Sequence, residues 1–272
     1  MLYLLHLKVV YDHAVDVPFW DEWEALSQTR PYNLSSTPII NYLSYYHNET
    51  RLFFTHLQEF LLLKLGGLNN IHHIVLTFLL YGILLCLHWN LQKKISPKIP
   101  LWLQSLSIAL LLTPWFWESH SWAQQSHTHY SLIFTLLLIH SLFKPKPSLM
   151  TFTSSSFLLC CAVFSFSRGA AMCMVVVPIY MIFSLIQYRQ DKNNFHLLSG
   201  AGFTAFSILT YAVYFGFIYL DPLPKSHVGM TYPWHLAFFH FFLSLCSKVF
   251  GYSSLNIFTG LVSFTVILMA LY

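Results

Sequence analysis

Residues 70–89 read NIHHIVLTFLLYGILLCLHW and contain no Asp, Glu, Lys or Arg. An α-helix needs about 20 mostly apolar residues to cross the hydrocarbon core of a bilayer. The stretch has that length, and the polar, basic sequence NLQKK follows it directly. We therefore predict that residues 70–89 form a membrane-spanning helix.

Similar apolar stretches follow along the chain. We predict further spans at residues 101–117, 127–143, 149–167, 170–187, 197–220, 234–249 and 255–272. The short apolar run at residues 1–10 is interpreted as part of a first helix, which brings the expected total to about nine. The predicted fold is an all-α, polytopic transmembrane helical bundle, with residues 1–272 as a single membrane domain.

The composition of the chain agrees with a membrane location. Of its 272 residues, 56% are hydrophobic and 9% are charged, whereas soluble domains carry about 25% charged residues. Aromatic residues make up 18% of the chain, and Trp and Tyr are typical of the interface between membrane and water. This composition argues against a soluble globular protein, and no nucleic-acid partner is expected.

Basic residues predict the orientation of the bundle. The loops after Trp89, Phe143, Gln187 and Val249 contain one acid, Asp191, and eight basic residues: Lys93, Lys94, Lys98, Lys144, Lys146, Arg189, Lys192 and Lys248. Cytoplasmic loops of membrane proteins are enriched in Lys and Arg. We therefore expect these alternate loops to face the cytoplasm.

Residues 11–66 are then expected to form an outer loop with interfacial helices. Within this loop, residues 11–59 contain two basic residues, Arg30 and Arg51, and seven of the ten acids of the chain: Asp12, Asp16, Asp21, Glu22, Glu24, Glu49 and Glu59. About eight spans follow it, within residues 70–272. The uneven helix count and the abrupt end at Tyr272 suggest a fragment of a longer protein.

Three acids near the start of this loop are candidate catalytic residues. Pro18 can begin a short helix with Asp16 near its cap, and that helix would rest its aromatic face on the membrane. Carboxylates near an apolar boundary have raised pKa values and can serve as general bases. Asp21, with Glu22 or Asp16 as the alternate, is the candidate base, and a solvated acidic face is the competing interpretation.

The stretch His47-Asn48-Glu49-Thr50-Arg51 is a candidate binding motif. On a helix, His47 and Arg51 would share one face, and Arg is suited to binding phosphate or carboxylate. The competing interpretation is an ion pair from Arg51 to Glu49 or Glu59 that stabilises the loop. Arg168, at a predicted outer turn, either binds a lipid phosphate or extends into the headgroups.

Residues 115–129 form a second expected outer loop, with Glu118, His120, His127 and His129. Three His and one Glu resemble a metal-ligand set, but no pair has the i,i+4 spacing that places two ligands on one helix face. We therefore expect an aromatic, polar rim and no metal site, although a divalent metal is kept as an alternative. The histidines within apolar helices, such as His73 and His88, are interpreted as hydrogen-bonded packing residues.

These motifs together resemble the GT-C superfamily of membrane glycosyltransferases, and within it uncharacterised bacterial GT-C-like membrane proteins. The resemblance is carried by four motifs: Phe19-Trp20-Asp21-Glu22-Trp23, His47-Asn48-Glu49-Thr50-Arg51, Trp117-Glu118, and Ser165-Phe166-Ser167-Arg168-Gly169. In the second motif Thr50 stands where such proteins have a His. The resemblance covers most of the chain, and it implies a bacterial inner membrane location with the acidic loop outside.

The resemblance also implies an activity. Such an enzyme transfers a sugar, with inversion, from a polyprenyl-phosphate carrier in the membrane lipid to an acceptor hydroxyl. Asp21 would be the base, and Arg51 and Arg168 would bind the carrier phosphate, with His47, Glu49 and Glu118 as further binding residues. No organic cofactor is expected, and the acceptor is left open. The alternatives are a lipid or sugar transporter and a non-catalytic scaffold for envelope assembly.

Overall fold

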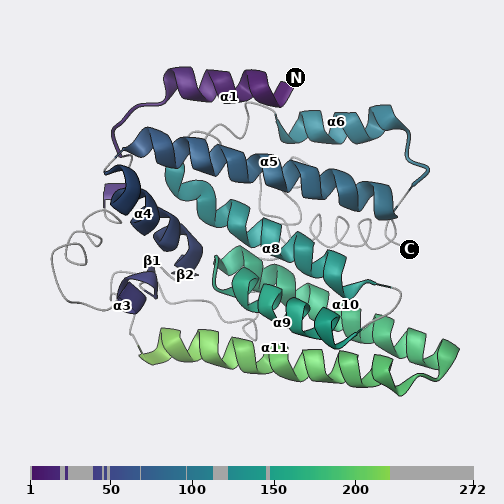
Figure 1. Cartoon of the computed structure of the whole chain (residues 1–272). Helices are drawn as coiled ribbons and strands as arrows, with labels where there is room; N and C mark the ends of the chain where they lie inside the picture. Colours follow the sequence, from purple (N-terminus) through teal and green to yellow (C-terminus); the bar gives the residue numbers. More distant parts are fainter. Residues whose placement is uncertain are drawn as a thin grey trace, which may run out of the picture. The chain divides into compact units, whose positions relative to one another are not determined.

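The computed structural model describes residues 2–18, 22–23, 39–44, 46–47, 50–67, 69–95, 97–112, 122–144 and 148–220. These residues belong to one compact unit, Met1–Pro222, and a second unit spans Leu223–Tyr272. The described part of the chain is mostly helical, as predicted (Figure 1). Its elements are α1 Leu2–His13, α3 Ile39–Leu43, β1 Tyr46–His47, β2 Thr50–Arg51, α4 Phe53–Gly66, α5 Asn70–Ile95, α6 Leu101–Leu111, η2 Ala123–Gln125, α8 Ser126–Leu142, α9 Leu149–Val163, α10 Ser167–Asp191 and α11 Asn194–Leu220.

Three helices in the described part of the chain are long and apolar enough to cross a membrane. They are Asn70–Lys94, Ser167–Asp191 and Asn194–Gly216, and they overlap the spans predicted at residues 70–89, 170–187 and 197–220. The other predicted spans that the structure describes correspond to shorter helices: α6, α8 and α9. The spans predicted at residues 234–249 and 255–272 lie outside the described residues, so the total of about nine stays a prediction.

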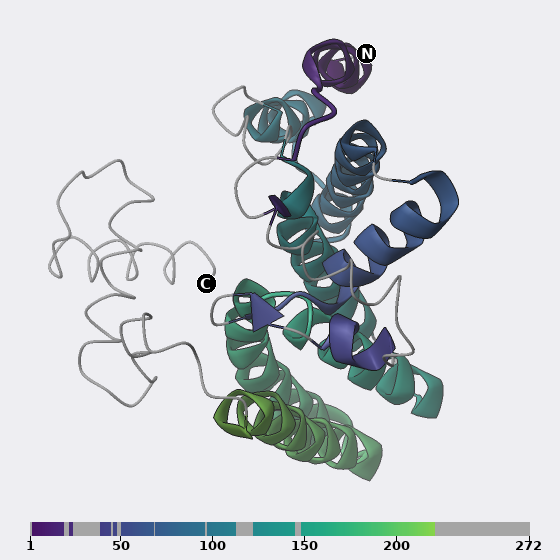
Figure 2. The ribbon, with the colours of Figure 1, turned by 90° about the vertical axis from the view of Figure 1, so that its left-hand side faces the viewer.

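One core of the unit lies among α8, α9, α10 and α11. Leu138, Leu159, Cys173 and Phe203, one from each helix, are fully buried there. Figure 2 shows these helices side by side. Helices α9 and α10 approach closely at Gly169, where an added Cβ would meet the carbonyl group of Ala162. The glycine in the Ser165–Gly169 motif is therefore required for helix packing.

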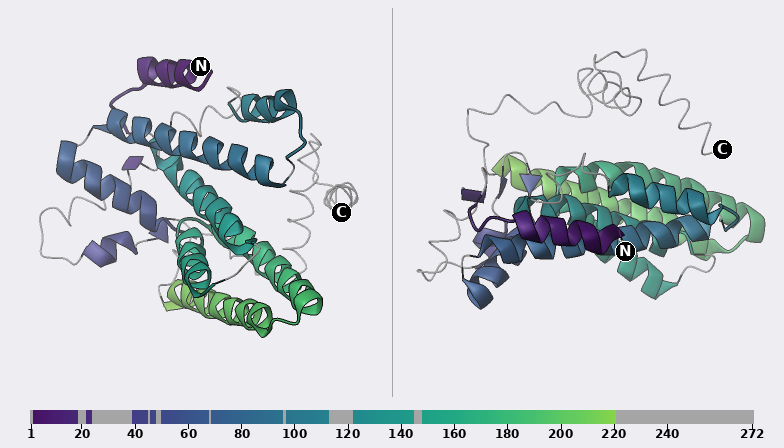
Figure 3. Two further views of the ribbon diagram at one scale, coloured as in Figure 1. Left: turned by 45° about the vertical axis from the view of Figure 1, so that its right-hand side comes forward. Right: turned by 90° about the horizontal axis from the view of Figure 1, so that it is seen from above.

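A second core lies among α1, α5, α6 and α8. Helix α1 lies against α5 (Figure 3), and the Tyr3 hydroxyl donates a hydrogen bond of 2.7 Å to the carbonyl oxygen of Phe78. The Tyr3 ring stacks on the Phe78 ring, with the centroids 4.8 Å apart. Residues 2–13 thus form a helix that packs on the first predicted full span.

The distribution of polar side chains supports a membrane location. Ser131, Thr135 and Ser155 are fully buried between helices, whereas Phe157 and Leu209 are 67% and 61% exposed on their outer faces. Small hydroxyl residues are typical of helix contacts within membranes, because they allow close approach and hydrogen bonding. Exposed apolar faces of this kind are costly in water but favourable in lipid.

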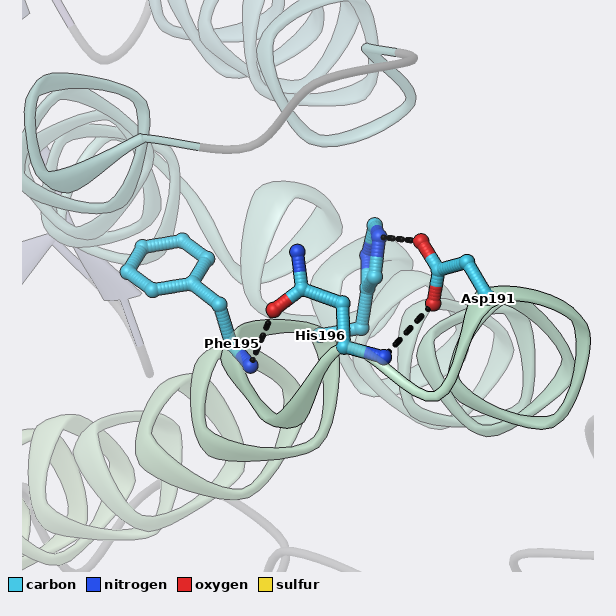
Figure 4. Close-up of polar contacts among 4 residues, drawn as sticks. Asp191, Phe195 and His196 are labelled. Carbon is cyan, nitrogen blue, oxygen red and sulfur yellow. Dashed lines mark hydrogen bonds and ion pairs between the residues drawn. The ribbon is translucent and has the colours of Figure 1, made fainter.

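A tight turn joins α10 to α11. His196 Nε2 lies 2.9 Å from Asp191 Oδ2, and the backbone N–H of Asn193 donates to the other carboxylate oxygen at 2.9 Å (Figure 4). Lys192 takes a left-handed conformation, with φ of 57°, which ends α10. The predicted basic loop after Gln187 is therefore this turn, with α10 extending to Asp191.

Candidate acidic site

A small cavity lies where α4 ends and α5 begins. Its volume is about 210 Å³, below the roughly 300–1,000 Å³ of pockets for drug-sized ligands. The lining residues come from the segment between α1 and α3, from the last turns of α4, from the α4–α5 turn and from α5: Asp16, Pro18, Trp23, Glu59, Leu62, Leu63, Gly67, Asn69, Asn70 and His73. Two acids of the predicted loop, Asp16 and Glu59, therefore line a cavity at the first turn of a candidate membrane span.

The turn between α4 and α5 forms one wall of this cavity. Gly67 has a φ of 70°, a left-handed conformation that glycine adopts without steric cost, and its N–H donates to Leu63 O at 3.2 Å. Asn69 then begins α5, because its Oδ1 accepts a hydrogen bond of 3.2 Å from the N–H of His72. The last turn of α4 and the first turn of α5 therefore meet at the cavity.

Asn70 fixes the acidic loop against α5. Its backbone N–H donates to Asp16 Oδ1 at 2.6 Å, and its side-chain amide donates to the carbonyl oxygen of Val17 at 3.3 Å and to Glu22 Oε2 at 3.1 Å. The N-terminus of a helix carries a partial positive charge that stabilises nearby anions. One asparagine therefore gathers two of the predicted catalytic acids, Asp16 and Glu22, at the start of α5.

Glu22 is buried, with 3% of its surface exposed. Its second oxygen, Oε1, accepts a hydrogen bond of 3.2 Å from the backbone N–H of Gln124, in the short helix η2 before α8. A buried carboxylate needs such donors to replace the water it has lost. The loop acid that was predicted as an alternate base is therefore part of the packed interior.

Glu59 is the second buried acid of the site and was not predicted as a site residue. Its Oε2 accepts a hydrogen bond of 2.7 Å from the hydroxyl of Tyr42, which is fully buried. Burial raises the pKa of Glu59 to about 8, the hydrogen bond from Tyr42 lowers this pKa, and the negative charge of Glu22 raises it. At neutral pH Glu59 is therefore mainly protonated.

The packing of α4 explains why Glu59 points inward. The adjacent Gln58 donates a hydrogen bond of 3.3 Å to the Thr77 hydroxyl of α5, and it accepts one of 2.9 Å from the Tyr130 hydroxyl of α8. The polar face of α4 is thus packed against α5 and α8. The signal in the sequence was an acid within the otherwise uncharged stretch LFFTHLQEFLLL, residues 52–63.

Two buried polar side chains beside these acids lack hydrogen-bond partners among the described residues. They are His73 at Nε2, which lines the cavity, and Gln124 at both atoms of its side-chain amide. The sequence interpretation of His73 as a hydrogen-bonded packing residue is therefore wrong at this nitrogen. His88, in contrast, has Gln92 Nε2 at 2.9 Å, in agreement with that interpretation.

The predicted binding motif around Arg51 does not form a helix. Residues Tyr46–His47 and Thr50–Arg51 pair as an antiparallel hairpin, with Tyr46 opposite Arg51. A hairpin does not give His47 and Arg51 the shared helix face that was predicted. Arg51 is 5% exposed, and its guanidinium donates to the carbonyl oxygen of Ser44. The alternative ion pair to Glu59 is not formed between these two described side chains, and Glu59 accepts a hydrogen bond from Tyr42.

The hairpin leads to the turn between α9 and α10. The N–H of Phe53, two residues after Arg51, donates to the carbonyl oxygen of Phe164 at 3.2 Å. Arg168 begins α10 at the same turn, with its guanidinium carbon 6.0 Å from the ring centroid of Phe166. The backbone two residues after Arg51 therefore contacts the turn at which Arg168 lies, although the two predicted phosphate-binding arginines are far apart in sequence.

Three predicted site residues, Asp21, Glu49 and Glu118, lie outside the described residues, as does the side chain of His47. Among the residues that the structure does describe, no three His, Cys, Asp or Glu side chains gather as a metal site.

Comparison with known proteins gives no relative for this chain: no protein-family model matches it, and neither a curated protein nor a solved structure is significantly similar to it.

Proposed function

We propose that this protein is a GT-C-like membrane glycosyltransferase. It transfers a sugar from a polyprenyl-phosphate carrier to an acceptor hydroxyl on the outer side of the membrane. The observation that carries the proposal is a cavity at the first turn of α5 that Asp16 and Glu59 line, with Glu22 bonded to the lining residue Asn70.

The acids of the site suit proton removal from an acceptor. Two neighbouring carboxyl groups in different environments can divide the roles of acid and base. Glu59 is mainly protonated at neutral pH, whereas Glu22 accepts two N–H hydrogen bonds. Asp21, which precedes Glu22 in sequence, is the proposed base, with Glu22 or Asp16 as the alternate. The acceptor oxygen attacks the anomeric carbon from the face opposite the phosphate, and its proton passes to the carboxylate.

The leaving group is the carrier phosphate, which departs with the electron pair of the broken bond. Arg168, exposed at the start of α10, and Arg51, on strand β2, are the donors that we assign to it, since charge on the phosphate grows in the transition state. Helix α4 links β2 to the acidic cavity. The rise from Leu52 to Glu59 is about 10 Å, so one extended substrate can reach both places.

The proposed setting is a multi-pass protein of a bacterial inner membrane, with the acidic loop facing outward. The basic residues of the alternate loops support this orientation. A membrane lipid carrying the donor sugar is the proposed partner.

One observation favours a second function, proton-coupled transport of a lipid or sugar. Glu59 is buried and changes protonation slightly above neutral pH, and buried ionisable groups of this kind form proton relays in transporters. A transporter would move its substrate across proteoliposome membranes without chemical change, whereas a transferase yields a new glycoside.

The decisive experiment measures transfer from a radiolabelled polyprenyl-phosphate sugar in membranes that contain the full chain. Loss of a general base typically costs about 10²–10⁴-fold in rate, so we expect Asp21→Asn or Glu22→Gln to lower transfer by that factor at matched protein level. Asp12→Asn is the control, because Asp12 is exposed and pairs only with Lys8 among the described side chains. Full activity in Asp16→Asn, Asp21→Asn and Glu22→Gln alike would reject the proposal.

A further inference from the structure

The acidic cavity has lining groups that restrict the charge of its ligand. Asp16 and Glu59 line it, Glu22 lies next to it, and none of the lining residues that the structure describes is Lys or Arg. An anionic group placed there would face the negative charges of Asp16 and Glu22 and would find no Lys or Arg among these lining residues to pair with. A phosphate or a carboxylated sugar is therefore disfavoured.

The cavity also has polar groups ready for a ligand with hydroxyls. His73 is 92% buried and lines the cavity, and its Nε2 has no hydrogen-bond partner among the described residues. Glu59 lines the same cavity and bonds Tyr42 through one carboxyl oxygen. A hydroxyl group can donate to one such group and accept from the other, which suits a ligand with several hydroxyls on one edge.

Trp23 gives the cavity an apolar wall. Its side chain is 58% exposed although it lines the cavity together with Leu62 and Leu63. An indole presents a large, rigid apolar face at little entropic cost. A sugar ring has a C–H face of matching character, so one face of the ring can contact Trp23 while its hydroxyls reach the polar groups.

We propose that this cavity binds one uncharged, hydroxyl-bearing ring, a neutral sugar, as the acceptor of the transfer, with Trp23 as its platform and His73 and Glu59 as its hydrogen-bonding partners. The role as acceptor rests on the proposed function, whereas the binding does not. The carrier phosphate then binds elsewhere, toward Arg51 and Arg168. The small volume of the cavity limits it to about one ring.

Binding is tested on the purified full chain in lipid nanodiscs, without any donor. Saturation-transfer NMR compares the methyl glycoside of a neutral hexose with that of the corresponding hexuronic acid. We expect the neutral glycoside to bind at least tenfold more tightly. Trp23→Ala should weaken its binding about tenfold, which corresponds to about 1.4 kcal/mol, while Trp23→Phe should retain much of it because an aromatic face remains.

Trp102→Ala is the matched control, because Trp102 is 67% exposed in α6 and does not line the cavity. Equal binding of the two glycosides, no binding of the neutral one, or an unchanged affinity in Trp23→Ala would overturn the inference. Binding without transfer would leave it intact and reject the glycosyltransferase function. Transfer without binding of the neutral glycoside would reject the acceptor site and leave the function.

Discussion

Replacing Glu59 by glutamine is expected to remove a pH dependence from the stability of the protein. Burial, together with the charge of Glu22, raises the pKa of Glu59 from 4.5 to about 8. Between these values the folded chain binds more protons than the unfolded chain. The free energy of unfolding contributed by this group therefore falls as the pH rises from about 4.5 to about 8, and it is constant above and below that window.

The size of the effect follows from the separation of the two pKa values. A difference of one unit between the folded and unfolded pKa values corresponds to about 1.4 kcal/mol in the free energy of unfolding. The difference between 4.5 and about 8 therefore amounts to about 5 kcal/mol. Glu59→Gln keeps an oxygen that accepts the hydrogen bond from Tyr42, and its amide carries no charge at any pH. The variant should therefore equal the wild type in stability near pH 5 and exceed it near pH 8.5.

The assay is thermal unfolding of the purified chains in detergent, from pH 5 to pH 8.5. At about 2–4 °C per kcal/mol, the variant should unfold about 10 °C or more above the wild type at the alkaline end. Asp12→Asn is the control, since an exposed carboxylate in a surface ion pair contributes little. A difference between Glu59→Gln and the wild type that is the same at both ends of the pH range would refute the burial of Glu59 beside Glu22.

Two further predictions concern packing and orientation. Gly169→Ala should destabilise the bundle by several kcal/mol, because the added Cβ would meet the Ala162 carbonyl group. Gly216→Ala has open space around the added Cβ and should stabilise α11 by up to about 1 kcal/mol. The unfolding midpoints of the two variants test this, and equal midpoints would contradict the close contact between α9 and α10. In a cysteine-free chain, a cysteine at position 21 should react with a membrane-impermeant reagent in intact cells, and a cysteine at position 94 should not. The reverse labelling would overturn both the orientation and the proposed chemistry.

The helices of this protein were predictable from sequence because the signal for them is local. The run at residues 70–89 is long and apolar enough to require a helix in lipid, and α5 covers it fully. The same reasoning identified α8, α9, α10 and α11, with ends that differ by several residues. It failed at residues 46–51, where a hairpin replaces the predicted helix, because six residues carry too little periodicity to separate the two.

The sequence by itself determined that the chain is helical, that several segments suit a membrane, and that the acids gather near its start. Only the tertiary structure decided which acids meet. Asn70 bonds Glu22 across 48 positions, and the charge of Glu22 acts on Glu59, which lies on α4 within the loop that was predicted to contain interfacial helices. The physical reason is that burial and pairing depend on which helix faces pack together, and hydrophobic periodicity along one segment has no information on the segment that will cover it.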